Sequence, residues 1–228
     1  MRIKTIILVC LAVFLPMMTP AQDVNPTATY ISDEGIETES DGDFSGQAPL
    51  DVTFRANPVD MDELSPVYEW HFKKEGEEKE IMVRYEEDTQ YTFMESGTTV
   101  VTLLVKLNSE GDELGPYTFH VTVSESKLTF PNAFSPNNGD LKNNTFKPKE
   151  CQSIVDFHAY IFNRWGQKLY EWTDPNAEGW DGTYKGKDVK EGTYFILVKA
   201  RGADGRKYKI RKDVNLLRGY TEGETMNN

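Results

Sequence analysis

The sequence is poor in cysteine, with only Cys10 and Cys151. Cys10 lies in an apolar run near the start that we expect to be removed, which leaves a single cysteine in the mature chain. An intramolecular disulfide is then excluded, although export would permit one. The fold must therefore be stabilised by buried apolar area rather than by crosslinks.

Long apolar runs are also missing. The longest, Ile6 to Leu15, is shorter than the ~20 residues of a membrane-spanning helix, so no membrane span is expected. Arg2 and Lys4 precede this run, and Thr19-Pro20-Ala21 follows it. A charged start, a short apolar middle and a small final residue are typical of a secretory signal peptide. We expect residues 1–21 to be cleaved off after Ala21.

Helical periodicity is absent as well. Short alternating runs rich in β-branched and aromatic residues recur between Gly, Pro, Asn and Asp, which is typical of strands. The predicted class is all-β, with two immunoglobulin-like sandwiches in tandem. The expected strands are Val52–Phe54, Val67–Phe72, Ile81–Tyr85, Val100–Leu107, Tyr117–Val123, Leu128–Phe134, Val155–Phe162, Leu169–Trp172, Tyr194–Val198 and Tyr208–Leu216.

Positive charge is scarce in the first half of the chain. Residues 22–127 hold 24 Asp and Glu against 7 Lys and Arg, a net of −17, whereas residues 128–228 hold 13 against 16, a net of +3. This asymmetry indicates two separate units, and the acidic half argues against nucleic acid as a partner. We expect an acidic linker with a first strand over 22–45, sandwiches over 46–126 and 127–218, and a disordered tail over 219–228.

Signatures of catalysis and of metal binding are lacking too. No G-x-S-x-G elbow or phosphate loop occurs, the three histidines have no ligand spacing, and Cys151 has no context that would activate its thiol. Asp41 to Gly46 begins like a calcium loop, but Val52 stands where the bidentate Glu is required. We therefore expect no enzyme, no cofactor and no metal site.

The acidic half resembles a PKD domain, an immunoglobulin-like module of exported proteins. Gly46 to Phe54 looks like its opening strand, and Tyr68-Glu69-Trp70-His71-Phe72 matches its central strand, in which Trp70 is expected in the core. Lys73-Lys74-Glu75-Gly76 departs from the Gly-Asp-Gly that usually follows. The resemblance implies a spacer or binding module.

The second half resembles the gliding-motility-associated C-terminal domain, the type B sorting domain of the type IX secretion system. Pro131 to Asn137 matches its opening, and Gly192-Thr193-Tyr194 and Val214 to Arg218 match its last strands. The signature residues on which the resemblance depends most are Asn163, Arg164, Trp165, Gly166, Trp180, Asp181, Gly182 and Tyr184. The resemblance implies the type IX secretion machinery as a partner.

One loop departs from that family. Asn137 to Asn144 has an inserted Asn, Leu141 in place of a Gly and Asn144 in place of an Asp. If the loop binds a cation in relatives, this copy lacks a carboxylate. Metal binding is therefore not expected here either.

Asn163 and Gly166 predict a hairpin turn, since both residue types tolerate positive φ. Alternation then directs Phe157, Ala159 and Ile161 to one face of the strand, and His158, Tyr160 and Phe162 to the other. We expect the rings of Trp165 and Trp180 to cover the second face, with Arg164 stacked on a ring. The same surface can also be the patch that the export machinery reads.

The sequence thus predicts an exported, non-catalytic protein of the cell surface or the extracellular medium. In it, a sorting domain carries a PKD-like module as cargo. The alternative is a glycan-binding or adhesive surface protein in which both sandwiches are interaction modules. Aromatic residues exposed across one sheet face would favour that alternative, and the candidates are Tyr85, Tyr91 and Tyr117.

Overall fold

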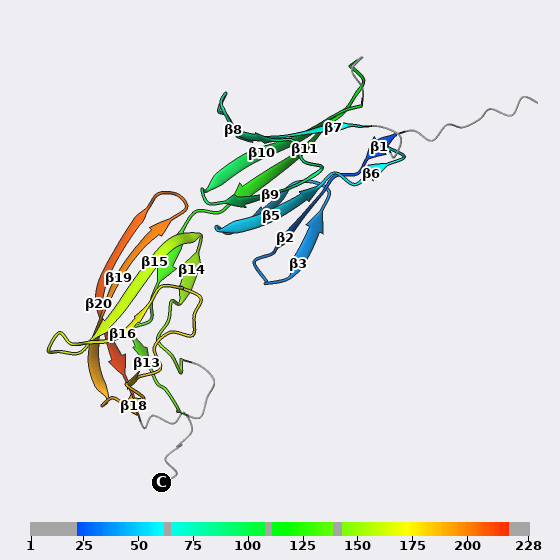
Figure 1. Ribbon diagram of the computed structural model, residues 1–228. Coiled ribbons are helices and arrows are strands. Elements are labelled where there is room, and N and C mark those ends of the chain that lie inside the picture. Colours follow the sequence, from blue (N-terminus) through cyan, green and yellow to red (C-terminus); the bar gives the residue numbers. More distant parts are fainter. Residues whose placement is uncertain (1–21, 62–64, 108–110, 139–142, 219–228) are drawn as a thin grey trace, which may run out of the picture.

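A computed structural model of the chain describes residues 22–61, 65–107, 111–138 and 143–218. These residues form two sandwich-like β domains joined end to end, with one domain inclined to the other (Figure 1). The all-β class predicted from the sequence is confirmed. The predicted signal segment and the predicted tail lie outside the described residues.

The first domain packs a four-stranded sheet on a five-stranded one. The four-stranded sheet has the order β3 (Glu37–Ser40), β2 (Thr27–Ile31), β5 (Leu50–Arg55) and β9 (Asp88–Phe93). The five-stranded sheet has the order β4 (Phe44–Gly46), β11 (Glu113–Val123), β10 (Gly97–Lys106), β7 (Val67–Lys74) and β8 (Glu80–Arg84). A short pair, β1 (Asp23–Val24) with β6 (Pro58–Val59), completes the domain.

Alternation along the central strand β7 sets the core of this domain. Tyr68, Trp70 and Phe72 are all buried, as the sequence predicts. The Trp70 ring lies 5.6 Å from that of Phe54, and its indole Nε1 donates to the carbonyl of Glu86 at 3.2 Å. A buried indole N–H needs such a partner, so this contact fixes how the ring is oriented.

Of the acidic linker and first strand expected over residues 22–45, the strand is present as β2, but the linker needs correction. The segment forms β1, β2, β3 and β4, and Val24, Ala28 and Phe44 are buried in the first core. These strands are short and carry few apolar side chains, and exposed Glu residues occupy β3. Pairing with distant partners, such as β4 with β11, stabilises the segment, and local composition does not reveal such pairing.

The second domain is built on one five-stranded sheet. Its order is β13 (Ala133–Phe134), β20 (Lys207–Leu216), β19 (Gly192–Gly202), β15 (Ile154–Phe162) and β16 (Lys168–Trp172). The inner face of this sheet is covered by the pair β12 (Lys127–Thr129) and β14 (Glu150–Gln152), and by connecting segments that include the pair β17 (Thr183–Tyr184) and β18 (Lys187–Asp188). Phe130, Phe146 and Trp180 supply the rings of this covering layer.

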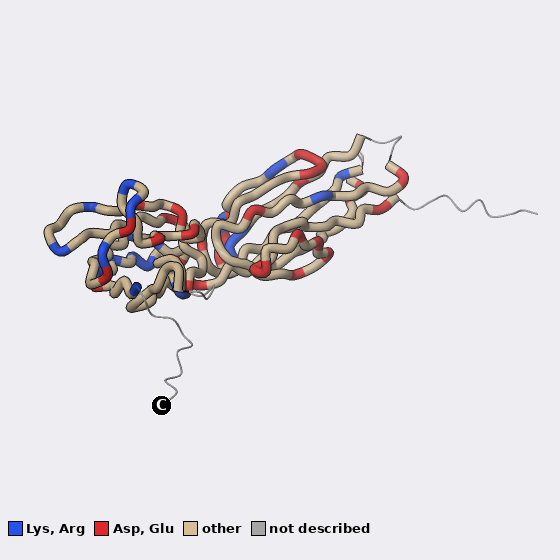
Figure 2. The backbone as a smooth tube through the Cα atoms, turned by 90° about the horizontal axis from the view of Figure 1, so that it is seen from below, with Lys and Arg blue, Asp and Glu red and all other residues tan. Residues whose placement is uncertain are grey.

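The two domains meet through direct contacts. The Ser153 hydroxyl accepts from the Ala48 amide at 3.2 Å, and the Ala203 carbonyl accepts from the Ser96 amide at 3.1 Å. Ala203 is itself buried in the core of the first domain. Asp and Glu positions are frequent along the backbone of the first domain, whereas Lys and Arg positions are more frequent in the second, in line with the charge division of the sequence (Figure 2).

Candidate functional site

The turn that joins β15 to β16 is fixed by its first residue. Asn163 Oδ1 accepts from the amides of Trp165 and Gln167, each at 3.0 Å. The Gly166 amide donates to the Asn163 carbonyl at 3.0 Å, and Gly166 has a φ of 78°. A side chain that satisfies two backbone donors, followed by a left-handed glycine, makes a tight turn with a defined direction. The predicted hairpin is confirmed.

Arg164 and Trp165 stand at the tip of this hairpin, away from the core. Trp165 is 78% exposed, so the expectation that its ring packs on the sandwich is wrong. The expected stacking of Arg164 is present, with its Cζ 4.8 Å from the centre of the Trp165 ring. Residues at a turn tip escape the two-residue period of the strands, and alternation could not place this ring.

Trp180 lies in the opposite environment. It is fully buried, with its ring 5.3 Å from Phe134 and 5.0 Å from Tyr194. Its amide and carbonyl pair with those of Phe146, and its indole Nε1 donates to the Thr183 carbonyl at 2.8 Å. Trp180 is therefore an anchor of the covering layer on the inner face of the sheet.

The outer face of β15 is consequently not covered in the way we expected. Phe157, Ala159 and Ile161 are buried on the inner face, as alternation predicts. Tyr160 and Phe162 point outward and are half-buried, and neither tryptophan ring covers them. The residue pattern predicted the two faces of β15, but it could not predict which face the Trp180 ring packs against.

The residues after Trp180 form a turn that is held from the C-terminal side. Asp181 Oδ1 accepts from the Thr183 amide at 2.9 Å, and Gly182 has a φ of 81°. Arg218 donates to the Gly182 carbonyl at 2.8 Å and to the Val189 carbonyl at 3.0 Å. Asp181 and Gly182 thus shape the loop, and Arg218 fastens it to the end of β20.

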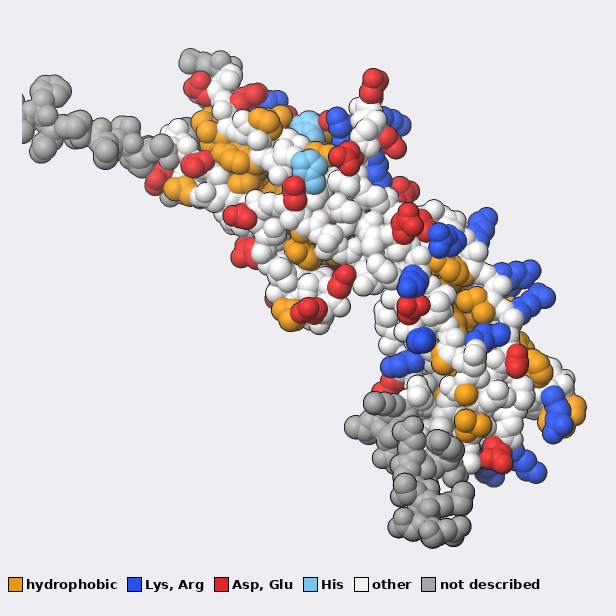
Figure 3. All heavy atoms as spheres, turned by 180° about the vertical axis from the view of Figure 1, so that it is seen from behind, with side chains coloured by type: hydrophobic (Ala, Val, Ile, Leu, Met, Phe, Trp, Pro, Cys, Tyr) orange, Lys and Arg blue, Asp and Glu red, His pale blue; other side chains and the backbone are white. Residues whose placement is uncertain are grey.

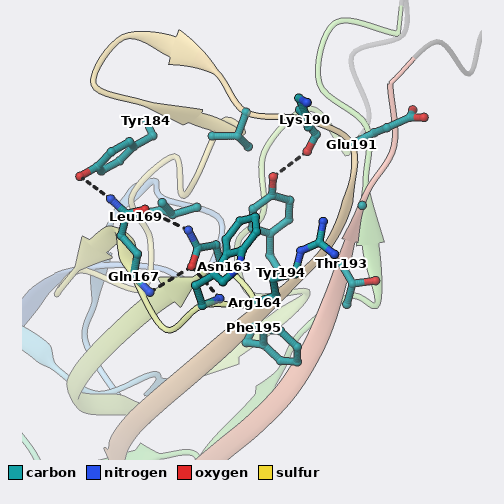
Figure 4. A pocket seen from close by; sticks show the side chains of 13 residues that line it. Asn163, Arg164, Gln167, Leu169, Tyr184, Lys190, Glu191, Thr193, Tyr194 and Phe195 are labelled. Carbon is teal, nitrogen blue, oxygen red and sulfur yellow. Dashed lines mark hydrogen bonds between the residues drawn. The ribbon is translucent and has the colours of Figure 1, made fainter.

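Tyr184 connects this loop to the hairpin. Its hydroxyl accepts from Gln167 Nε2 at 3.2 Å, while Gln167 Oε1 accepts from Asn163 Nδ2 at 3.0 Å (Figure 4). Two signatures that lie about 20 residues apart in the sequence are therefore joined by one chain of hydrogen bonds. The bond between Gln167 and Tyr184 is the one that crosses from the hairpin to the loop, so removing either of these two side chains would break the chain there.

A pocket of about 650 Å³ lies between these elements (Figure 4). Of the predicted residues, Asn163, Arg164, Trp165 and Tyr184 line it, while Gly166, Trp180, Asp181 and Gly182 do not. Several other residues that line the pocket were not predicted from the sequence, among them Gln167, Lys190, Glu191 and Phe195. Side chains alternate along a strand, so an inward-facing Tyr194 places its neighbour Phe195 on the outer face. This alternation was the one signal in the sequence that could have predicted the position of Phe195.

Tyr194 forms the floor of this pocket. Its hydroxyl donates to the Lys190 carbonyl at 2.6 Å. Burial raises the pKa of Tyr194, although the nearby cations of Arg218 and Arg164 oppose that shift. The pocket thus presents aromatic rings, amide groups and one exposed guanidinium, and aromatic residues and Arg are enriched at protein interfaces.

The features considered for metal binding or catalysis have structural partners. Asp43 accepts from the His120 amide at 2.8 Å and lies 2.9 Å from the His120 ring, so it caps a strand. Burial raises the pKa of the Cys151 thiol, which lowers its reactivity at neutral pH. Among the described residues no three His, Cys, Asp or Glu side chains gather as ligands. The loop at Asn137 to Asn144 falls partly outside the described residues.

The three candidate tyrosines of the first domain do not form one exposed stripe. Tyr85 is exposed, but Tyr91 packs against Phe93 with ring centres 4.7 Å apart. Tyr117 lies in the opposite sheet and donates to Asp23 at 3.0 Å. Within the described part of the chain, no helix is long and apolar enough to cross a membrane.

Comparison with known families bears on the second domain. Residues 128–212 match the model of the CHU_C type IX secretion signal domain. The predicted sorting domain is thereby supported by its family, whereas a PKD assignment of the first domain is not specifically shown. A domain of this family implies contact with the type IX secretion machinery and export to the cell surface or beyond it. No curated protein matches the chain.

Three solved structures superpose weakly on the chain. The FN1–FN3 domains of chicken CNTN1 share 11% identity, with a TM-score of 0.27 and coverage of 82% of this chain and 76% of theirs. SGBP-B of a Bacteroides ovatus mixed-linkage glucan utilization locus, in complex with a mixed-linkage heptasaccharide, shares 14%, with a TM-score of 0.29 and coverage of 77% and 42%. A tetra-tandem repeat of the extending region of a large adhesion protein shares 12%, with a TM-score of 0.27 and coverage of 86% and 68%.

Proposed function

We propose that this is an exported, non-catalytic cell-surface protein whose second domain addresses it to the type IX route. The first domain, a PKD-like sandwich, is the cargo and acts as a spacer or binding module. The match of residues 128–212 to a type IX secretion signal domain carries the proposal. The predicted signal peptide over residues 1–21 would supply the first export step.

The Arg164–Trp165 hairpin is the part of the second domain that we assign to recognition by the secretion machinery. Most of the signature is used for folding, because Trp180, Asp181 and Gly182 build the covering loop. Arg164 and Trp165 make no such contribution, since both are exposed and stack only on each other. An exposed large ring held on a rigid turn, beside a pocket, is typical of an interaction surface.

The experiment is a fusion of residues 127–228 to a neutral exported reporter in a cell that has the type IX machinery. Surface labelling should find the wild-type fusion outside the cell and should find the Arg164→Ala fusion retained. Lys149→Ala removes an exposed cation remote from the hairpin and serves as the matched control.

Retention of the wild-type fusion in the periplasm would reject the sorting function. Equal delivery of the wild-type and Arg164→Ala fusions would restrict the hairpin to a role other than recognition. Circular dichroism of each purified fusion separates failed delivery from failed folding.

A further inference from the structure

The outer face of the large sheet in the second domain is not covered by any other described element. Along β15, β19 and β20 side chains alternate between buried or half-buried positions on the inner face and more exposed positions that point outward. Cross-strand pairing aligns the outward side chains in rows, such as Phe162 with Phe195 and Tyr160 with Leu197. An antiparallel sheet commonly leaves one face in solvent, so the kind of side chain on this face, rather than its openness, indicates whether it docks a partner.

Apolar side chains occupy the half of this face that lies next to the hairpin. Phe195 is 44% exposed, and Phe162, Phe195 and Leu197 line a depression of about 620 Å³. Phe195 also lines the pocket beside Trp165, so the apolar side chains continue from the sheet face to the hairpin tip. We call Trp165, Phe162, Phe195 and Leu197 the apolar ridge.

Cations surround the apolar ridge and fill the rest of the face. The outward cations on the four long strands are Lys168, Lys199, Arg201, Lys207, Lys209 and Arg211. The outward carboxylates on the same strands are Asp156, Glu171 and Asp213. Glu171 is paired with Lys168 and His158, and Asp156 lies opposite Arg201. The face therefore carries a net positive charge, with basic side chains beside hydrophobic ones (Figure 3).

The aromatic rings on β15 are arranged for insertion rather than for stacking on a sugar. The His158 and Tyr160 rings are 4.4 Å apart and inclined by 20°, and those of Tyr160 and Phe162 are 6.1 Å apart and inclined by 30°. Rings stacked along a strand cover part of each other's faces. A sugar ring needs an open aromatic face, whereas a protruding tryptophan beside tyrosine suits the boundary between lipid headgroups and acyl chains.

We propose that the outer face of this sheet docks the protein on an anionic lipid surface. The apolar ridge enters the headgroup region and the surrounding Lys and Arg side chains lie against lipid phosphates. Charge complementarity favours an anionic lipid surface as the partner of this face. Residues 128–228 carry a net charge of +3, whereas residues 22–127 carry a net charge of −17. An anionic surface attracts the second domain and repels the first, so the first domain points away from the membrane.

The test uses the purified protein and vesicles, and it needs no secretion machinery, so its outcome is independent of the sorting proposal. The protein should cosediment with vesicles of mixed phosphatidylcholine and phosphatidylglycerol but not with vesicles of phosphatidylcholine alone. Tryptophan emission should shift to the blue on binding, because Trp165 is exposed while Trp70, Trp172 and Trp180 are buried. High salt should weaken the binding.

Two variants and one control locate the contact. The double variant Lys199→Glu with Lys209→Glu should lower the partition coefficient by about 100-fold or more. Each cation near an anionic surface raises the partition coefficient about fivefold, and replacing a cation by an anion changes the charge by two units. Phe195→Ser should lower partitioning by about tenfold, so that more lipid is needed to reach the same blue shift. Lys149→Glu reverses a charge on the far side of the domain. Its partition coefficient should stay at least about tenfold above that of the paired reversal. All variants should keep the wild-type melting temperature.

Failure to bind the anionic vesicles, or equal binding by the paired reversal and the control, would overturn the proposal. Two other occupants would also overturn it. Preferential binding to soluble polygalacturonate, lost in the same variants, would assign the face to an acidic polysaccharide. Concentration-dependent self-association, lost in the same variants, would assign it to the acidic domain of a second copy.

Discussion

Trp165 and Trp180 each precede a turn glycine, but they have opposite roles. Trp180 is enclosed by Phe134, Phe146 and Tyr194, and its N–H is satisfied. Trp165 contacts mainly the Arg164 guanidinium and is otherwise in solvent. Burial and hydrogen bonding stabilise the fold only in the first case. The difference can be measured because each ring can be removed separately.

We expect Trp180→Ala to destabilise the second domain by about 3–5 kcal/mol, the usual cost of removing a buried Trp. Trp165→Ala should change its free energy of unfolding by no more than about 0.5 kcal/mol, as for other surface substitutions. Urea denaturation followed by circular dichroism gives both values. A loss above about 2 kcal/mol for Trp165→Ala would show that its ring is buried in solution.

At the scale of the element, the β15–β16 hairpin presents Arg164 and Trp165 on a turn that needs Asn163. Its Oδ1 accepts two backbone hydrogen bonds, and its Nδ2 adds the bond to Gln167 that continues to Tyr184. The turn therefore depends on the carboxamide oxygen more than on the nitrogen. Asp retains that oxygen and Ala removes it.

Asn163→Ala should destabilise the domain by about 1–3 kcal/mol, because two hydrogen bonds of about 0.5–1.5 kcal/mol each are lost. Asn163→Asp should cost less, since the acceptor remains. Chemical denaturation measures stability, and amide exchange at Trp165 and Gln167 reports the turn directly. Identical protection of these amides in Asn163→Ala and the wild type would contradict the assigned role of the side chain.

At the scale of the whole molecule, the junction between the domains decides whether the chain behaves as one rod. Gly202 lies there in close contact with Ser126: a Cβ at this position would fall 2.1 Å from the Ser126 hydroxyl oxygen. The same hydroxyl donates to Asp204 at 2.7 Å, and Ala203 inserts into the first core. Glycine is required because the two segments approach so closely.

Gly202→Val should open this junction while leaving both sheets intact. Small-angle scattering should then show a broader distribution of maximum dimensions than in the wild type, with little change in the circular dichroism spectrum. The control is Arg201→Ala, which shortens an exposed side chain next to Gly202 and adds no atom at the junction. Scattering curves of Gly202→Val that superpose on the wild type would show that Ser126 moves aside without loosening the domains.

The junction should also weaken in acid. Burial of Asp204 favours its neutral form, but hydrogen bonds from Ser126 and from the Arg206 backbone outweigh burial and lower its pKa below the ordinary value. A carboxyl group whose pKa is lowered on folding stabilises the fold above its unfolded pKa of about 3.9, and that contribution is lost as pH falls through the folded value. The melting temperature of Asp204→Asn should therefore lie below wild type at neutral pH, and the difference should shrink below about pH 4. A constant difference across this range would exclude the carboxylate as its source.

The two domains should nevertheless fold separately, because each has its own hydrophobic core. Residues 22–126 and 127–228 expressed alone should each melt cooperatively, with calorimetry as the measurement. Aggregation of both fragments beside a soluble full chain would refute the boundary predicted between residues 126 and 127.

The sequence by itself determined the all-β class, the charge division, the buried face of β7 and the signatures of the second domain. These follow from period-two alternation, turn residues and composition, which are local properties. Only the tertiary structure decided that residues 22–45 belong to the first sandwich, that Trp180 is inside while Trp165 is outside, and that Phe195 meets the hairpin. Each of these depends on which distant segments pair and on which face of a strand is covered. Alternation tells which side chains share a face, but the energy that buries one face comes from contacts far apart in the chain.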